Sequence, residues 1–278
     1  MSKNINFHAF LVYDRPRLAR NGWFVETLTE KFARRGWNLT LKIAEELESV
    51  KLEEPFPDAV LMRCTFPELS RKWEEAGVRV FNSATVSAVT NDKLRTAEFF
   101  AVHDLPMMKT VLLTRTDDNR DSGKFSVPFP FPVVMKSRTG HGGTEVFCVK
   151  SESKITEILK QTVTPPEYWI LQPLASQPGR DVRVYIVGNQ PVAAMERISE
   201  TDFRSNYSLG GSARPYTLRP AEKTLISKIL EILPLDFAGI DLIFHDGHPI
   251  LNEIEDVVGS RMLYAHTEID ILDVFLDY

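Results

Sequence analysis

Apolar runs alternate with amphipathic segments through the first third of the chain. Short runs rich in Val, Leu, Ile and Phe predict buried strands at residues 7–13, 39–43, 58–63 and 78–82. Between them, apolar residues at helical spacing predict helices over 19–35 and 68–76, each followed by a glycine. Strands that alternate with helices pair in parallel. Residues 1 to about 85 are therefore expected to form a small, open α/β sheet.

After residue 90 the pattern changes to hairpins separated by single helices. Asn91-Asp92 predicts a helix start at Lys93, because Asn or Asp caps the first turn. Strands are predicted at 105–114, 169–174, 181–187 and 191–197, and hairpins over 131–149 and 238–255. Helices are predicted at 151–161, 222–233 and 269–276, and polar loops at 115–124 and 202–211.

The hairpin over 238–255 carries carboxylates in both arms. Glu253 and Glu255 share one face of the second arm, because side chains alternate along a strand. A three-residue loop from Asp246 to His248 would place Asp241 directly opposite Glu253. Carboxylates that converge in this way repel one another unless a cation lies among them, and oxygen ligands suit Mg²⁺ or Mn²⁺. The alternative is that these acids face solvent on a half-exposed hairpin.

The hairpin over 131–149 has a glycine-rich tip. Gly140, Gly142 and Gly143 allow positive φ and a close approach of backbone N–H groups to an anion. Lys136 ends the incoming strand and points toward the same place. Lys93, near the start of its helix, is mildly disfavoured there by the helix dipole, which suggests another role for it. A purely structural turn at 140–143 remains the alternative.

Arginines follow two predicted strands of the first sheet. Ligands of open α/β sheets bind beyond the carboxyl ends of the strands. Arg15, Arg17 and Arg63 all follow strands and are candidates to meet an anionic ligand. The alternative is that they are solvated surface arginines.

Composition narrows the class of protein. The chain has 278 residues, a net charge of −5, 43% hydrophobic and 26% charged residues, as expected for a globular protein of more than one domain. A negative net charge argues against a general nucleic-acid binder. Cys64 and Cys148 lack metal-ligand spacing and read as reduced thiols of a cytoplasmic protein. We expect neither a signal peptide nor a membrane span, because no apolar run approaches the ~20 residues that a span needs.

The order of these motifs is itself informative. A lysine is followed by a lysine with a glycine-rich hairpin, an Asp-x-Arg strand, an Arg-Ser-Asn loop and a carboxylate hairpin. In this order the sequence resembles the ATP-grasp superfamily, and within it the RimK-like amino-acid and peptide ligases. The resemblance spans about Asn91 to Ile271. Its most specific parts are DVRVYIVGNQPVAAMER, leading into DFRSNYSLGG, and FAGIDLIFHDGHPILNEIE.

The resemblance implies an ATP-grasp fold behind a small α/β pre-ATP-grasp domain. The expected domains are 1–88 and 89–278, the second divided into a smaller lobe, 89–173, and a C-terminal lobe, 174–278, with the nucleotide between them. The implied ATP-binding residues are Lys93, Lys136, Gly140, Gly142, Gly143, Gln172, Pro173, Leu174, Asp181, Arg204, Ser205 and Asn206.

The resemblance also implies a role for each group. The two lysines hold phosphates beneath the glycine-rich tip at 140–143, which is the flap. Residues 172–174 form the hinge against adenine, and Asp181 bonds ribose. Lys136, Arg183 and Arg204 face the γ-phosphate as catalytic residues. Asp241, Glu253 and Glu255 hold two Mg²⁺, with Mn²⁺ as a possible substitute.

Three departures from the family pattern concern the hinge, the metal pair and the acceptor side. Pro173 stands where the family commonly has glutamate, which removes or replaces one hinge contact. Glu255 stands where Asn is usual, and the added charge is expected to tighten metal binding. The family's Pro-Gly turn is replaced by residues 257–261, on the acceptor side. Arg261, with Arg15 or Arg17, is a candidate to bind a substrate carboxylate.

The implied activity is ATP-dependent ligation of a carboxylate to an amine through an acyl phosphate, with small molecules such as amino acids as substrates. The resemblance suggests a homodimer or homotetramer, and neither a membrane nor a nucleic acid is an expected partner. Two other functions remain open from the sequence. One is a kinase of the same fold that transfers the γ-phosphate to a hydroxyl group, and the other is a nucleotide-binding module without turnover.

Overall fold

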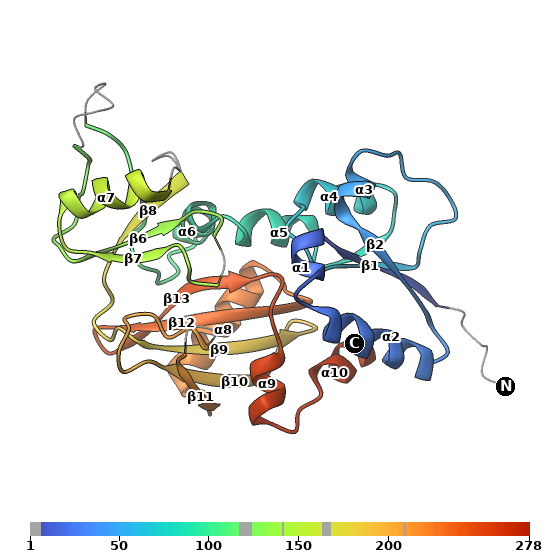
Figure 1. The fold of residues 1–278 in the computed structure, drawn as a ribbon. Coiled ribbons are helices and arrows are strands. Elements are labelled where there is room, and N and C mark those ends of the chain that lie inside the picture. The colour runs from blue at the N-terminus through green and yellow to red at the C-terminus, as the bar shows by residue number, and fades with distance from the viewer. Residues whose placement is uncertain (1–6, 117–123, 141, 163–167, 208–209) are drawn as a thin grey trace.

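Three β-sheets organise the chain. The computed structural model describes residues 7–116, 124–140, 142–162, 168–207 and 210–278. Within this part, each sheet has its own region of the molecule, and a pair of short helices leads from the first sheet to the other two (Figure 1). The mixed α/β class expected from the sequence is confirmed.

The N-terminal sheet is parallel, as predicted, with the strand order β2-β1-β3-β4. Its strands are β1 (His8–Tyr13), β2 (Asn38–Ile43), β3 (Ala59–Met62) and β4 (Arg79–Phe81), and its helices are α1 (Arg15–Leu18), α2 (Gly22–Arg34), α3 (Ala44–Glu48) and α4 (Pro67–Glu75). The helix predicted from residue 19 begins at Gly22. The reason is that Asp14 caps a separate short helix, α1, by accepting a hydrogen bond from the Arg17 N–H.

Two helices connect this sheet to the rest of the chain. They are α5 (Ala84–Thr90) and α6 (Lys93–Ala101). The Asp92 side chain accepts hydrogen bonds from the backbone of Leu94 and Arg95 and so caps α6 where the sequence predicted.

The small sheet is antiparallel with the order β5-β8-β6-β7. Its strands are β5 (Val111–Leu112), β6 (Val133–Ser137), β7 (Val146–Val149) and β8 (Trp169–Pro173), and α7 (Glu152–Thr162) packs on it. The strand predicted over 105–114 is only two residues long. Its upstream half instead meets the large sheet, where Leu251 N–H donates to Pro106 O at 2.9 Å. Most of the predicted loop at 115–124 falls outside the described residues.

The large sheet is antiparallel with the order β11-β10-β9-β12-β13. Its strands are β9 (Arg180–Val187), β10 (Gln190–Ile198), β11 (Ser212–Pro215), β12 (Phe237–His245) and β13 (His248–Glu255), and the helices of this region are α8 (Pro220–Ile232), α9 (Arg261–His266) and α10 (Ile271–Asp277). The strand β11 was not predicted, because its four residues carry little apolar pattern.

Both faces of the large sheet are covered, which follows from the alternation along its strands. On β9, Val182, Val184 and Ile186 share one face, as the pattern predicted, and they pack under α8. Tyr185 and Val187 face the other way, into a core that includes α10 and residues of β1, β3 and α2. The N-terminal sheet therefore shares a hydrophobic core with the C-terminal helix (Figure 1). Among the described residues, no helix is long and apolar enough to cross a bilayer.

Candidate active site

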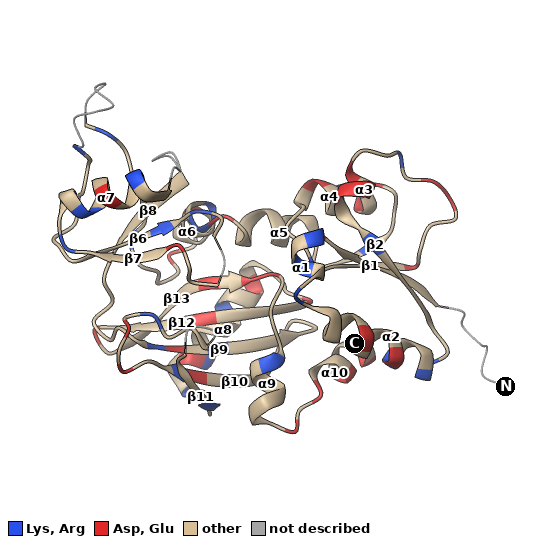
Figure 2. Cartoon of the chain, viewed as in Figure 1, with Lys and Arg blue, Asp and Glu red and all other residues tan. Residues whose placement is uncertain are grey.

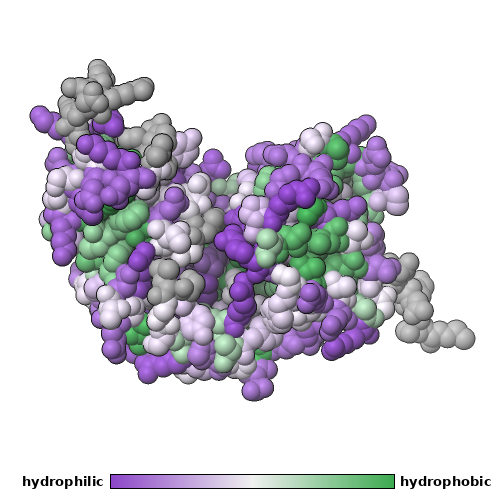
Figure 3. Space-filling view, viewed as in Figure 1, coloured by the Kyte–Doolittle hydropathy of each residue, from purple (hydrophilic) through white to green (hydrophobic). Residues whose placement is uncertain are grey.

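One cleft lies between the small sheet and the large sheet and encloses about 820 Å³, including its open mouth. Figure 3 shows a notch between the half with the small sheet and the half with the N-terminal sheet. The predicted residues that line the cleft are Lys93, Lys136, Gly140, Gly142, Gly143, Gln172, Pro173, Leu174, Asp181, Arg204, Ser205, Asn206 and Glu253. Residues separated by up to 160 positions are therefore brought to one place.

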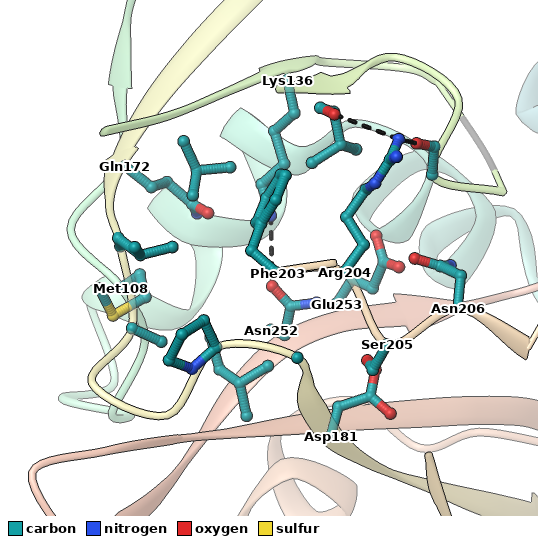
Figure 4. Close-up of a pocket in the computed structure, with 18 of the residues that line it drawn as sticks. Met108, Lys136, Gln172, Asp181, Phe203, Arg204, Ser205, Asn206, Asn252 and Glu253 are labelled. Carbon is teal, nitrogen blue, oxygen red and sulfur yellow. Dashed lines mark hydrogen bonds between the residues drawn. The ribbon is translucent and has the colours of Figure 1, made fainter. Parts of the chain in front are cut away.

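Two lysines mark one side of the cleft. Lys136, at the end of β6, is 5% exposed, and its Nζ donates to Asn252 Oδ1 at 3.2 Å (Figure 4). Burial disfavours the ammonium and lowers the pKa of Lys136 to about 8, although the nearby Glu253 carboxylate opposes this shift. Lys93 Nζ donates to Gly140 O and lies 3.8 Å from Glu253 Oε2. Lys93 thus lies between the tip of the glycine-rich hairpin and the carboxylate hairpin, and Lys136 contacts the carboxylate hairpin.

The glycine-rich tip needs its glycines for conformation and for space. Gly142 and Gly143 have φ of 72° and 76°, in the left-handed region that side chains disfavour. A Cβ on Gly143 would lie 2.7 Å from Asn206 Oδ1, whereas one on Gly142 would meet nothing within 4 Å. The tip therefore packs closely against the loop that carries Asn206. Its neighbour His141 lies outside the described residues.

Arg204 links this loop to the glycine-rich tip. Its Nη1 donates to Gly143 O at 2.9 Å, and its Nη2 donates to Asp202 Oδ2 at 2.6 Å. The hydrogen bond from Arg204 lowers the pKa of the Asp202 carboxyl. Arg204 thus holds the glycine-rich tip and the loop together beside the cleft.

The opposite side of the cleft is mostly apolar. Met108, Val134, Leu174 and Ile243 are among its lining residues. Gln172 is buried there (Figure 4). Its Nε2 donates to Thr110 Oγ1 at 2.8 Å, which fixes the side-chain amide. An apolar slot with one oriented amide suits a flat heteroaromatic ring.

A ladder of alternating charges runs across the large sheet beneath the cleft. Strand register places Asp181 opposite Arg197 and Arg183 opposite Asp241. Arg197 Nη2 bridges Asp181 Oδ2 at 2.6 Å and Asp241 Oδ2 at 2.7 Å. Arg183 forks onto both oxygens of Asp241 at 2.8 and 2.7 Å, and it reaches Glu255 Oε1 at 2.6 Å. Both arginines and Asp241 are buried.

The ladder keeps Asp241 ionised. Burial alone would raise the pKa of Asp241, but the charges and hydrogen bonds of Arg183 and Arg197 outweigh burial and lower it to about 2. Glu255 responds differently, since burial dominates and raises its pKa despite Arg183. Arg183 also offsets the extra charge of Glu255, so tighter metal binding does not follow from that charge alone.

The three predicted metal ligands converge. One carboxylate oxygen from each of Asp241, Glu253 and Glu255 lies within 4.8 Å of the others. Asp241 accepts three hydrogen bonds from the arginines, which leaves one of its roughly four lone-pair sites free. An all-oxygen set of this kind fits Mg²⁺.

Asp241 and Glu253 face each other as predicted, but for a different reason. The hairpin has a two-residue loop, Asp246-Gly247, with φ of 48° and 80°, rather than the three-residue loop expected. His245 pairs with His248, and the register then shifts by one residue between Asp241 and Leu242. The loop is one residue shorter than expected and the register shift adds one residue back, so Asp241 still lies opposite Glu253.

The candidate substrate arginines lie outside this cleft. Arg15 pairs with Glu46 at 2.5 Å, and Arg17 donates to Asp14. Arg261 donates to Arg20 O at 3.0 Å and so joins α9 to the segment after α1; both helices carry basic residues (Figure 2). The fourth arginine considered, Arg63, is buried and donates to Val258 O at 2.7 Å. It therefore holds the chain that follows the carboxylate hairpin.

Two residues of the site were missed by the sequence reasoning. Arg197 lines the cleft and joins the two buried aspartates. A regular hairpin on the predicted turn at Gly188-Asn189 would place Glu196 opposite Asp181, and Arg197 takes that place only because the register shifts between Pro191 and Ala193. Strand alternation therefore gave no signal for it. Asn252 also lines the cleft, but regular alternation would place it on the other face from Glu253.

Comparisons with known proteins identify relatives of this chain. Residues 90–278 match the model of the RimK-like ATP-grasp domain. Human N-acetylaspartylglutamate synthase A is 31% identical over 234 residues, which are 80% of this chain and 60% of that protein. A probable alpha-L-glutamate ligase of Parasynechococcus marenigrum (strain WH8102) is 27% identical over 210 residues, 75% of this chain and 45% of that protein. The chain thus spans about half the length of these relatives.

The solved structures support the same fold. The RimK domain protein ATP-grasp from Sphaerobacter thermophilus DSM 20745 superposes with a TM-score of 0.74 at 20% identity, covering 97% of this chain and 98% of that one. D-alanine–D-alanine ligase from Bacillus anthracis complexed with ATP superposes with a TM-score of 0.72 at 13% identity, covering 98% of this chain and 91% of that one. The fold expected from the resemblance is confirmed, and this chain belongs to the RimK-like ATP-grasp family.

Proposed function

We propose that the protein is an ATP-dependent ligase that joins a carboxylate to an amine. The observation that carries this proposal is the convergence of Lys93, Lys136 and Arg204 with three carboxylates around one cleft under a glycine-rich flap. Phosphoryl transfer depends mainly on positioning and on neutralising charge, and these groups serve both purposes. The names of the relatives, a synthase and a probable glutamate ligase, support the same reaction class.

In the proposed reaction, ATP lies with its base in the apolar slot beside Gln172 and its phosphates near Lys93 and Lys136. Substrate carboxylate oxygen attacks the γ-phosphorus, and the bond to ADP breaks to leave an acyl phosphate. The amine then attacks the acyl carbon, phosphate leaves, and the amine loses a proton. Arg204 stays beside the transferred phosphoryl group in both steps. The flap excludes water, which would otherwise hydrolyse the acyl phosphate.

Asp241, Glu253 and Glu255 would hold Mg²⁺, which neutralises phosphate charge when it is bound. We propose two ions, with Mn²⁺ as a substitute. The contacts of Asp181 and Arg183 suggest a revision of their expected roles. Asp181 already accepts both of its arginine bonds from Arg197, and Arg183 is committed to Asp241 and Glu255. We therefore propose that both shape the site, Asp181 rather than bonding ribose and Arg183 rather than facing the γ-phosphate.

The remaining proposals concern substrates and organisation. Because the matching relatives are named for glutamate compounds, we propose an amino acid with an additional carboxylate as one substrate. Arg15, Arg17 and Arg261 are the candidates to bind that carboxylate. We retain residues 1–88 and 89–278 as domains, with lobes at 89–173 and 174–278. A homodimer or homotetramer is proposed from the family resemblance, and a cytoplasmic location from the reduced thiols expected at Cys64 and Cys148.

The test is ADP release with hydroxylamine trapping across pools of amino acids and small carboxylates. Wild type is compared with Glu253→Gln, and Glu30→Gln on the exposed face of α2 serves as the matched control, since Glu30 contacts only the surface residue Arg34 among its described ion pairs. Formation of a hydroxamate by wild type and Glu30→Gln but not by Glu253→Gln supports the proposal. ADP release without hydroxamate, in the presence of an alcohol acceptor, would instead support the kinase.

A further inference from the structure

A β-bulge in the carboxylate hairpin places an extra residue in the cleft. From the Asp246-Gly247 turn to the pair Leu242–Leu251, residues of β12 and β13 face each other in regular register. The next pair is Asp241–Glu253, so Asn252 has no partner on β12. One strand therefore offers two residues where the other offers one, which re-aims the side chains locally.

The burial pattern follows from this bulge. Leu251 and Ile254 are buried in the core, at 0% and 2% exposure, whereas the two residues between them both line the cleft. In a regular strand, Asn252 and Glu253 would point to opposite faces. The bulge thus brings a neutral amide and a carboxylate side by side into the site (Figure 4).

The amide of Asn252 is bound to a buried lysine. Its Oδ1 accepts a hydrogen bond of 3.2 Å from Lys136 Nζ. Within the part of the chain that the structure describes, this is the one hydrogen bond that the Lys136 ammonium donates to a side chain. A lysine ammonium is a point charge on a flexible stem, so one fixed acceptor decides where the charge rests. Lys136 enters from the small sheet, whereas Asn252 belongs to the large one.

The neighbouring charges explain why a neutral acceptor is useful. Glu253 is adjacent to Asn252 and already has Lys93 3.8 Å away. A second lysine pairing with Glu253 would take up lone pairs of a proposed metal ligand and would turn its own charge away from the phosphates. An amide oxygen holds the ammonium by a charge-assisted hydrogen bond without adding negative charge.

We propose that Asn252 is a positioning residue that holds the Lys136 ammonium over the phosphate subsite and apart from Glu253. This inference rests on the proposed function, because it requires that a nucleoside triphosphate binds in the cleft. Asn252 acts through Lys136 and does not itself touch the base. Its loss should therefore weaken binding of the phosphates and leave binding of the nucleoside unchanged.

The experiment compares the dissociation constants of ATP and adenosine, each measured by displacement of a fluorescent ATP analogue. The Asn252→Leu variant keeps the side-chain shape and removes the acceptor; Asn252→Ala is the second variant, should Leu prevent folding. Thr110→Val is the contrasting variant, because it removes the partner of Gln172 on the base side. For Asn252→Leu we expect ATP to bind about tenfold more weakly, as for loss of a hydrogen bond to a charged group, and adenosine within twofold of wild type.

Thr110→Val should weaken the binding of ATP and of adenosine by the same factor. This result would show that the assay separates the base subsite from the phosphate subsite. Equal weakening of both ligands by the Asn252 variants, or no change in either, would overturn the positioning role while leaving the proposed function intact. Failure of the wild-type protein to bind ATP at all would contradict the proposed function as well.

Discussion

At the scale of single residues, the site is built from charges that are buried but paired. Asp241 is 1% exposed and accepts bonds from two arginines, whereas Glu253 is 26% exposed and lies 3.8 Å from Lys93. Removing one partner of a buried ion pair leaves the other uncompensated, while an exposed pair contributes little. Two carboxylates of one proposed metal site therefore differ in what they do for the fold.

This difference gives a prediction for stability. Asp241→Asn should lower the free energy of unfolding by about 3 kcal/mol, because Arg183 and Arg197 lose a buried counter-charge. Glu253→Gln should change it by less than about 1 kcal/mol. Urea unfolding followed by circular dichroism measures both. Equal destabilisation by the two substitutions would contradict the structural role assigned to the ladder.

A second prediction concerns pH. Burial lowers the pKa of Lys136 to about 8, so its ammonium is present below that pH and is lost as the pH rises through it. If this charge binds phosphates, ATP affinity should be steady between about pH 7 and 8 and should fall about tenfold per pH unit above that. The control is Lys136→Arg, whose guanidinium stays charged throughout. Identical pH profiles for the two proteins would rule Lys136 out as the cause.

At the scale of elements, the glycine-rich hairpin can be tested with two neighbouring glycines. Both have positive φ, so an alanine at either position costs about 1–2 kcal/mol of backbone strain. A Cβ on Gly143 would in addition press on Asn206. Gly143→Ala should therefore lower turnover at least about tenfold more than Gly142→Ala, because displaced groups at a reacting centre are costly. Steady-state kinetics would show this, and equal effects would indicate that strain alone matters.

Much of the element plan could be predicted from the sequence. The parallel N-terminal sheet, the capped α6, the strand β9 and the hairpins over 131–149 and 238–255 all have local signals, such as Asp92 at a helix start or the pattern of Val182, Val184 and Ile186. The bulge at Asn252 has no such signal, since it appears only in the pairing of β12 with β13. The pairing of Asp241 with Glu253 was predicted from a wrong loop length, and it holds because the two-residue turn and the bulge compensate.

At the site, residue types could be predicted but their partners could not. Arg183 was expected to face a phosphate, yet the register of β9 with β12 commits it to Asp241. Asp181 likewise bonds Arg197. These contacts depend on the order of strands in the large sheet, which hydrophobic alternation does not reveal.

At the scale of the whole molecule, the N-terminal sheet is joined closely to the rest of the chain. Asn82, buried at the end of β4, donates to Phe237 O at 2.8 Å and Asp256 Oδ1 at 2.8 Å, and it accepts from Asp236 N–H at 2.8 Å. The hydrophobic core on this side contains residues of β1, α2 and α10 together. The proposed domains at 1–88 and 89–278 are thus not energetically separate.

A fragment of residues 89–278 tests this point. It would expose the apolar faces of α10 and β12, so we expect it to aggregate or to lack a cooperative unfolding transition. The full chain should unfold in a single transition, as followed by both fluorescence and circular dichroism. A soluble, cooperatively folded fragment that binds ATP as tightly as the full chain would contradict the shared core.

The central claim is that the cleft transfers the γ-phosphoryl group of ATP to a carboxylate. The most direct measurement uses the acid found by hydroxylamine trapping, labelled with ¹⁸O in its carboxylate, together with its amine partner. Phosphorus NMR of the released phosphate then shows whether the label has moved. The account predicts one ¹⁸O in each phosphate, because the acyl phosphate breaks at the acyl carbon and the bridging oxygen leaves with phosphorus. Unlabelled phosphate, released with amide formation, would contradict it.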